Sequence, residues 1–108
     1  TRLIIFNIMP SNTTFNMFFY TYVLQSLKDG DRYIGYTTNL KKRLEEHNKG
    51  LSLSTKSRTP FKLVYYEAGL NDVAAHRREN YLKTTQGRRF LGLRLKEYQR
   101  ASAFGIES

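Results

Sequence analysis

The stretch DRYIGYTTNL, residues 31–40, decides the fold because it passes from strand-forming to helix-starting residues within a few positions. Its first half favours a β-strand over residues 32–36. Its second half contains two threonines and an asparagine, residue types that cap helices at the N-terminus. We therefore expect a strand, a corner, and a helix over residues 39–49 with Thr38 as its N-cap.

Tyr33 and Gly35 lie at this corner, and two interpretations of them are open. In the first, Tyr33 packs into the core and Gly35 lets the chain bend. In the second, the corner builds a binding site. The missing side chain of Gly35 then leaves room for a phosphate, and the N-terminus of the following helix attracts the same anion.

The segments on either side of this stretch predict an α+β domain. Residues 18–25 alternate with a period of two, which predicts a strand. Asp29-Gly30 predicts a hairpin between that strand and residues 32–36. The other expected elements are a third strand, Phe61–Ala68, a helix capped by Asn71 or Asp72 that runs to about Lys83, and a basic helix from about Arg88 to Arg100. The predicted order is β-β-α-β-α-α, a three-stranded antiparallel sheet flanked by helices.

The charge balance predicts a polyanionic partner. Eighteen Lys and Arg residues stand against nine Asp and Glu residues, a formal net charge of +9. The chain has no Cys, which excludes disulfides and cysteine-bound zinc and favours a cytoplasmic location. No apolar run reaches the ~20 residues that a membrane helix needs, so we expect no membrane partner.

The length of 108 residues predicts one domain, which we place at residues 17–100. Residues 1–16 are expected to be an N-terminal tail that does not belong to the domain. Leu3 to Met9 could instead form an additional strand. Residues 101–108 are expected to be a C-terminal tail.

Four motifs follow one another at set intervals: a Tyr-x-Tyr strand, a Tyr-Ile-Gly strand, an Arg-x-x-x-His helix and a glutamate in a later helix. This ordered set resembles the GIY-YIG nuclease superfamily, and most closely its small single-domain bacterial members. The resemblance covers roughly Phe18 to Tyr98. The first motif departs from the family pattern, because it reads Tyr20-Thr21-Tyr22 in place of Gly-Ile-Tyr.

The resemblance implies a metal-dependent endonuclease that hydrolyses DNA phosphodiester bonds. The catalytic residues that it implies are Tyr22, Tyr33, Arg43, His47 and Glu79, with Gly35 as supporting backbone. It also implies that Glu79 binds Mg²⁺ or Mn²⁺, for which a hard carboxylate oxygen is a suitable ligand.

Each of these side chains also has an ordinary structural interpretation. Glu79 could form a surface ion pair with Lys83, four residues later. His47 continues an apolar helical stripe and could be a core histidine, and the two tyrosines could simply pack. Arg43 and His47 share one side of a helix, where Arg43 could hold a phosphate oxygen and a neutral His47 could relay a proton.

The other basic residues are expected to contact the nucleic-acid backbone without sequence preference. They are Lys56, Arg58, Arg77, Arg78, Lys83, Arg88 and Arg89, joined by Arg94 and Lys96 in the C-terminal region. The expected partner is DNA, with RNA as an alternative, and no small-molecule cofactor is expected. We expect a role in DNA repair or processing, with selection for DNA structure rather than sequence. The alternative is a catalytically weak nucleic-acid-binding module that keeps the nuclease fold.

Overall fold

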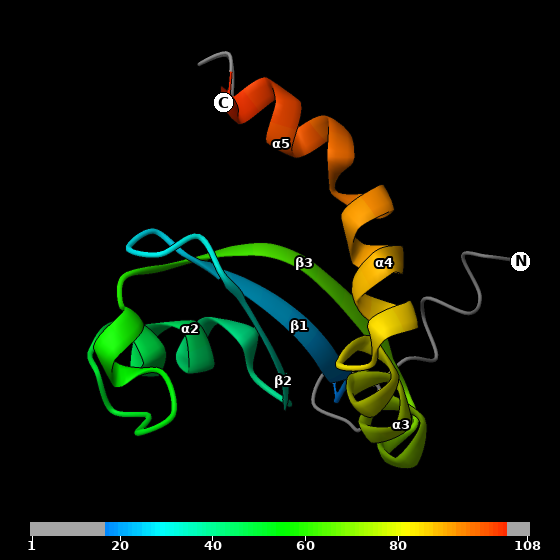
Figure 1. Ribbon diagram of the computed structural model, residues 1–108. Helices are drawn as coiled ribbons and strands as arrows, with labels where there is room; N and C mark the ends of the chain where they lie inside the picture. The colour runs from blue at the N-terminus through cyan, green and yellow to red at the C-terminus, as the bar shows by residue number, and fades with distance from the viewer. Residues whose placement is uncertain (1–16, 104–108) are drawn as a thin grey trace, which may run out of the picture.

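The computed structural model describes residues 17–103 and contains one three-stranded antiparallel sheet (Figure 1). The strands are β1, Phe19–Ser26; β2, Arg32–Thr37; and β3, Phe61–Gly69. Their spatial order is β2-β1-β3, so β1 is the central strand and β2 and β3 are the edges. The central position of β1 explains its sequence, because a strand covered on both faces has few positions left for polar residues.

The helices are α2, Leu40–Asn48; α3, Asp72–Leu82; α4, Thr85–Arg94; and α5, Lys96–Ala103. A 3₁₀ turn, η2, Lys56–Arg58, lies in the segment that precedes β3. The α+β class and the three-stranded antiparallel sheet predicted from the sequence are confirmed.

The cap of α2 differs from the prediction, because Asn39 and not Thr38 is the N-cap. Asn39 has extended backbone angles, and its side-chain oxygen accepts a hydrogen bond from the amide of Lys42 at 3.1 Å. Thr37 supports this turn, since its hydroxyl accepts a hydrogen bond from the amide of Asn39 at 3.1 Å. Gly50 ends the helical region with a φ of +73°, a left-handed conformation that glycine adopts without steric cost.

The single basic helix expected over residues 88–100 is two helices, and it starts earlier. Thr84 caps α4 through a hydrogen bond from the amide of Gly87 at 3.0 Å, so the TTQG sequence starts a helix. The chain then turns at Leu95, between α4 and α5. Helix α5 continues to Ala103, so residues 101–103 of the expected tail are helical.

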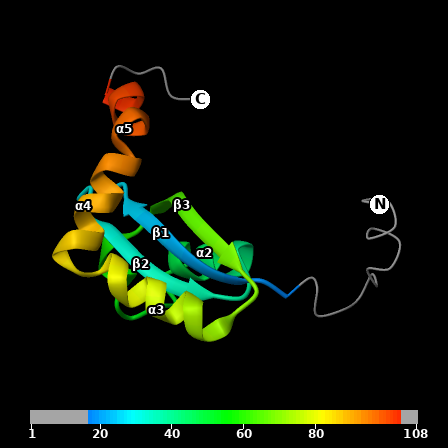
Figure 2. The same ribbon diagram turned by 90° about the vertical axis from the view of Figure 1, so that its right-hand side faces the viewer.

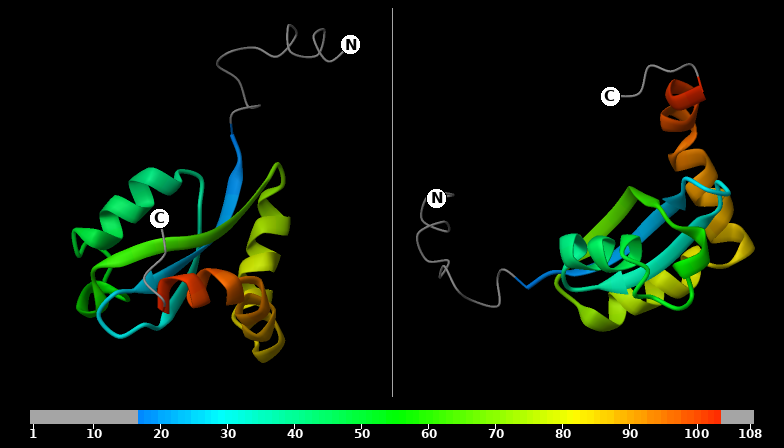
Figure 3. Two further views of the ribbon diagram at one scale, coloured as in Figure 1. Left: turned by 90° about the horizontal axis from the view of Figure 1, so that it is seen from above. Right: turned by 90° about the vertical axis from the view of Figure 1, so that its left-hand side faces the viewer.

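Helices cover both faces of the sheet (Figure 3). On one face, Tyr22, Leu24 and Phe61 form a core with side chains of α2. On the other face, Val23 and Ile34 pack against Leu82 of α3 and Leu91 of α4. Successive strand residues point to opposite faces, so neighbours in β1 belong to different cores. Tyr22 and Tyr33 therefore face α2.

No helix within residues 17–103 is long and apolar enough to cross a membrane. Residues 1–16 and 104–108 lie outside the described part of the chain. The expected N-terminal tail, and the alternative strand from Leu3 to Met9, therefore fall outside the structure.

Candidate active site

Tyr22 lies at the centre of the candidate site because the register of β1 and β2 pairs it with Gly35. A Cβ atom at Gly35 would overlap the hydroxyl group and the ring of Tyr22. The missing side chain therefore makes room for a tyrosine, and not for the phosphate that we expected there. Tyr22 is 2% exposed, and its ring fills the space above the Gly35 backbone.

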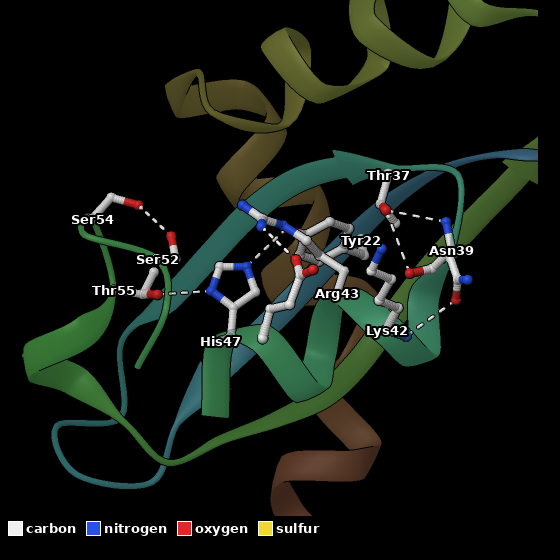
Figure 4. A network of polar contacts seen from close by, with 10 residues as sticks. Tyr22, Thr37, Asn39, Lys42, Arg43, His47, Ser52, Ser54 and Thr55 are labelled. Atoms are coloured by element: carbon white, nitrogen blue, oxygen red, sulfur yellow. Dashed lines mark hydrogen bonds and ion pairs between the residues drawn. The ribbon is translucent and has the colours of Figure 1, made fainter. Parts of the chain in front are cut away.

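Tyr22, Arg43, His47 and Thr55 form one chain of hydrogen bonds (Figure 4). The Nε–H of Arg43 donates to the Tyr22 hydroxyl oxygen at 3.3 Å. The Tyr22 hydroxyl lies 2.9 Å from Nε2 of His47, and Nδ1 of His47 lies 2.7 Å from the Thr55 hydroxyl. Arg43 and His47 reach the same tyrosine because they are one helical turn apart on α2.

His47 is fully buried, and burial is the main reason that its pKa falls to about 4. The charge of Arg43 lowers this pKa further. His47 is therefore neutral near pH 7, with one ring nitrogen that donates and one that accepts. In one tautomer, Tyr22 donates to Nε2 and Nδ1 donates to Thr55. In the other tautomer, both directions are reversed.

The Tyr22 hydroxyl is a weaker acid than a free tyrosine. Burial raises its pKa, whereas the hydrogen bond and the charge of Arg43 lower it. The charges of Tyr33 and Glu79 raise this pKa further. Tyr22 is therefore protonated at neutral pH.

Tyr33 is half-buried on the same face of the sheet. Its ring centroid lies 5.1 Å from that of His47 and 6.3 Å from that of Tyr22. Tyr33, Tyr22, Arg43 and His47 thus form one contiguous cluster between the strands β1 and β2 and the helix α2. This cluster contains four of the five catalytic residues that the family resemblance implies.

Glu79 lies on α3, across the sheet from α2, and does not contact this cluster directly. Its carboxylate pairs with Lys83 Nζ at 3.0 Å and lies 3.4 Å from Nδ1 of His76. The surface-pair interpretation thus correctly describes the Lys83 contact, although the Glu79 side chain is only 17% exposed. The His76 ring stacks on Tyr36 of β2 with centroids 3.8 Å apart, and this contact links Glu79 to the β2 edge.

Among the five catalytic residues that the resemblance implies, Glu79 is the one whose carboxylate could hold a divalent ion. Within residues 17–103, no three His, Cys, Asp or Glu side chains gather as a possible metal site. A single carboxylate fits Mg²⁺, which keeps several waters and takes further oxygens from phosphates. Lys83 is an exposed side chain on the same helix, so it can move away from one carboxylate oxygen without disturbing the core.

The basic residues expected to contact nucleic acid fall into two groups. The first group already has partners within the protein. Arg58 forms an ion pair with Asp29 at 3.2 Å, and Arg78 forms one with Glu67 at 2.9 Å. Lys83 is held by Glu79, and Arg88 donates through Nε to the Lys83 carbonyl at 3.2 Å. The exposed side chains without a hydrogen bond or ion pair of this kind in the described residues are Lys56, Arg77, Arg89, Arg94 and Lys96.

Three neighbours of the site escaped the sequence analysis. Thr55 is fully buried against His47, Glu46 pairs with Arg43 at 3.0 Å, and His76 lies beside Glu79. A buried histidine needs a partner for each ring nitrogen, so the need for a residue such as Thr55 was foreseeable. Which residue would take this role was not foreseeable, because the loop between α2 and β3 contains several Ser and Thr hydroxyl groups.

The fold and the cluster define a small α+β domain of the nuclease type, and comparison with known proteins gives its family. A family model described as the GIY-YIG catalytic domain matches residues 18–92. The chain belongs to the GIY-YIG family.

The relatives are small proteins named UPF0213. CPE1444 of Clostridium perfringens is 45% identical over 65 residues, which are 59% of this chain and 69% of that protein. HQ_3675A of Haloquadratum walsbyi is 37% identical over 70 residues, 64% of this chain and 78% of the relative. The solution NMR structure of BH0048 from Bacillus halodurans has 35% identity and a TM-score of 0.44, covering 69% of this chain and 82% of that one.

Proposed function

We propose that the protein is a metal-dependent endonuclease that hydrolyses DNA phosphodiester bonds, selects DNA structure rather than sequence, and acts in DNA repair or processing. Membership of the GIY-YIG family supports the nuclease type of function. The observation that carries the finer proposal is the hydrogen bond that fixes Arg43 on Tyr22.

Arg43 is the residue proposed to bind the scissile phosphate. Its side chain is 33% exposed, and it uses Nε for Tyr22 and one terminal nitrogen for Glu46. A guanidinium has five N–H donors, so donors remain for two phosphate oxygens. Because Arg43 is already held in place, it can stabilise the charge that builds on the phosphate without further ordering.

The two tyrosines have different proposed roles because their burial differs. Tyr22 is 2% exposed and bonds Arg43 and His47, so we assign it the positioning of Arg43. Tyr33 is half-buried and is proposed to orient the attacking water through its hydroxyl group. His47, neutral and fully buried, is proposed to hold Tyr22 in place and to relay a proton from a nearby tyrosine or water.

Glu79 is the residue proposed to hold Mg²⁺ or Mn²⁺. When bound, such an ion supplies charge neutralisation at the phosphate and a more acidic water. The link from Glu79 through His76 to Tyr36 keeps the carboxylate near the β2 edge. Lys56, Arg77 and Arg89, which are exposed, are proposed to attract DNA, or RNA as the alternative substrate.

The alternative function is nucleic-acid binding with little catalysis, and the Glu79–Lys83 pair favours it, because a carboxylate held by a lysine is less available to a metal. A cleavage screen separates the two functions. It uses labelled single strands, duplexes, flaps and branched junctions, with Mg²⁺, Mn²⁺ or a chelator.

We predict that Glu79→Ala abolishes metal-dependent cutting and leaves DNA affinity equal or slightly higher, because one negative charge is removed. Glu45→Ala is the matched control, since Glu45 is an exposed carboxylate on α2. Metal-dependent cutting by pure Glu79→Ala protein would contradict the role of Glu79. Binding without cutting by the parent protein, on every substrate, would favour the alternative function.

A further inference from the structure

A depression of about 230 Å³ lies at the β1–β2 hairpin, away from the tyrosine cluster. It is lined by Gly30, Asp31, Arg32, Arg88 and Gln99. The hairpin, α4 and α5 therefore meet here, where the hairpin passes beside the column of the two helices (Figure 2). Arg32 and Tyr33 are neighbours in β2 and point to opposite faces of the sheet.

The two arginines bring two positive charges close together. Arg32 is half-buried, and neither an ion pair nor a side-chain hydrogen bond engages it within residues 17–103. Burial lowers the pKa of Arg32, and the charge of Arg88 lowers it further, so the two guanidinium groups repel each other. Asp31 lines the same depression but forms no ion pair with either arginine in this part of the chain.

The donors that remain suit a tetrahedral oxyanion. Among the described residues, Arg88 uses only Nε, for the Lys83 carbonyl, so its terminal nitrogens have no partner there. Arg32 has its whole planar fork available, and Gln99 adds an amide group. At Gly30, no atom lies within 4 Å of the position of a Cβ, which leaves the rim of the depression open.

We propose that Arg32 and Arg88, together with Gln99, form a phosphate-binding site that holds the backbone of a nucleic-acid strand outside the catalytic cluster. The proposal rests on the proposed function only in taking the phosphate to belong to a nucleic acid. The position of β2 at the sheet edge supports this source. Arg32 and Tyr33 lie on opposite faces of this edge strand, so a nucleic-acid strand that passes around the edge is proposed to meet both the phosphate site and the catalytic cluster.

Equilibrium binding of a labelled single strand tests this site. It is measured over a range of salt concentrations in a chelator, so that no cleavage occurs. The parent is compared with Arg32→Gln, Arg88→Gln, the double variant, and Arg100→Gln as a control. Arg100 is an exposed arginine of α5 that pairs with Glu97 and does not line the depression.

If two arginines share one phosphate, the reductions in salt-dependence slope caused by the two single substitutions should not add up in the double variant. Each single variant should reduce the slope of log K against log[salt] by about 0.7, and the double variant by about the same amount. Arg100→Gln should keep the parent slope. Unchanged slopes in the single variants, or a double variant that loses about twice as much, would overturn the shared site.

Inorganic phosphate distinguishes a small ligand from a nucleic-acid strand. If phosphate raises the melting temperature of the parent but not of Arg32→Gln, while the DNA slopes stay equal, the site binds a small phosphate and the assignment to a strand is wrong. Parallel melting curves also establish that each variant folds. Neither measurement requires cleavage. A protein that binds nucleic acid but never cleaves it would still give the predicted slopes, so the test of this site is separate from the test of the proposed nuclease activity.

Discussion

His47 has only a tyrosine and a threonine as hydrogen-bond partners, and no exposed surface. In that position a neutral ring satisfies both neighbours. A protonated ring would have to donate from both nitrogens and would repel Arg43. The sequence indicated a histidine on an apolar helical face, and the structure adds that this histidine connects the hydroxyl groups of two other elements.

We predict that protonation of His47 destabilises the fold at low pH. Its folded pKa is about 4, below the ~6.5 of an unfolded histidine, so the unfolded chain binds the proton first as the pH falls. This residue's contribution should be complete above about pH 6.5 and be lost towards pH 4, by an amount on the order of 3 kcal/mol. Urea unfolding of the parent and of His47→Gln between pH 4 and 8 measures the difference.

His76→Gln is the matched control, because His76 is the other histidine of the chain and is 51% exposed. The difference between the two variants isolates the part of the pH dependence that belongs to the buried His47 ring. If His47→Gln does not fold, an NMR titration of the His47 ring in the parent gives the same information. A ring that titrates near pH 6.5 would contradict this prediction.

Gly35 is a second residue of the site with a specific structural role, because its lack of a Cβ atom makes room for the Tyr22 ring. We predict that Gly35→Ala displaces the Tyr22 ring, breaks its bonds to Arg43 and His47, and destabilises the fold by about 1–3 kcal/mol through overpacking. Cleavage at saturating DNA should fall as well. Unfolding and cleavage assays should show little effect for Gly69→Ala, a strand glycine with no atom within 4 Å of the added carbon.

At the scale of elements, the corner between α3 and α4 depends on a single close approach. The backbone of Gly87, in the first turn of α4, lies against the Tyr81 carbonyl and the backbone of Leu82. An added Cβ would overlap main-chain atoms, which cannot rotate away. This packing fixes where α4 begins and brings Leu91 into the same core as Leu82.

Two glycines of α4 should therefore respond in opposite ways to the same substitution. Gly87→Ala should destabilise the protein by at least 1 kcal/mol through overpacking, because α4 must shift away from α3. Gly92→Ala should stabilise it by roughly 0.5–1 kcal/mol, because the space is open and alanine is the better helix former. Denaturant unfolding of both variants is the measurement, and equal effects would contradict this account of the corner.

The elements themselves were largely predictable from local patterns. Alternation in β1 and Asp29-Gly30 in the hairpin depend on neighbouring residues alone, and both predictions agree with the structure. The break at Leu95 was not predictable, because residues 88–100 contain no Pro that would end a helix. The choice of Asn39 over Thr38 was equally hidden, since both residue types cap helices.

At the scale of the whole molecule, composition predicts the excess of positive charge but not its distribution. The sequence shows nine acids, and only the fold shows that Asp29 and Glu67 neutralise Arg58 and Arg78. The place of Glu79 relative to Arg43 was also not predictable from the sequence. Only the fold shows that the helix of Glu79 lies across the sheet from Arg43. Tyr22 with Arg43 and His47 was easier to foresee, because the two helical residues are one turn apart.

The net charge of +9 should govern how DNA approaches, whereas Arg43 should govern the chemical step. The most direct test is the single-turnover cleavage rate at saturating DNA for Arg43→Ala, with Lys41→Ala as a control that removes an exposed cation from the same helix. We predict a loss of roughly 10²–10³-fold for Arg43→Ala, typical of losing a preorganised donor to the transition state, and a rate near that of the parent for Lys41→Ala. Equal rates for Arg43→Ala and the parent would contradict the claim that the arginine held by Tyr22 acts on the scissile phosphate.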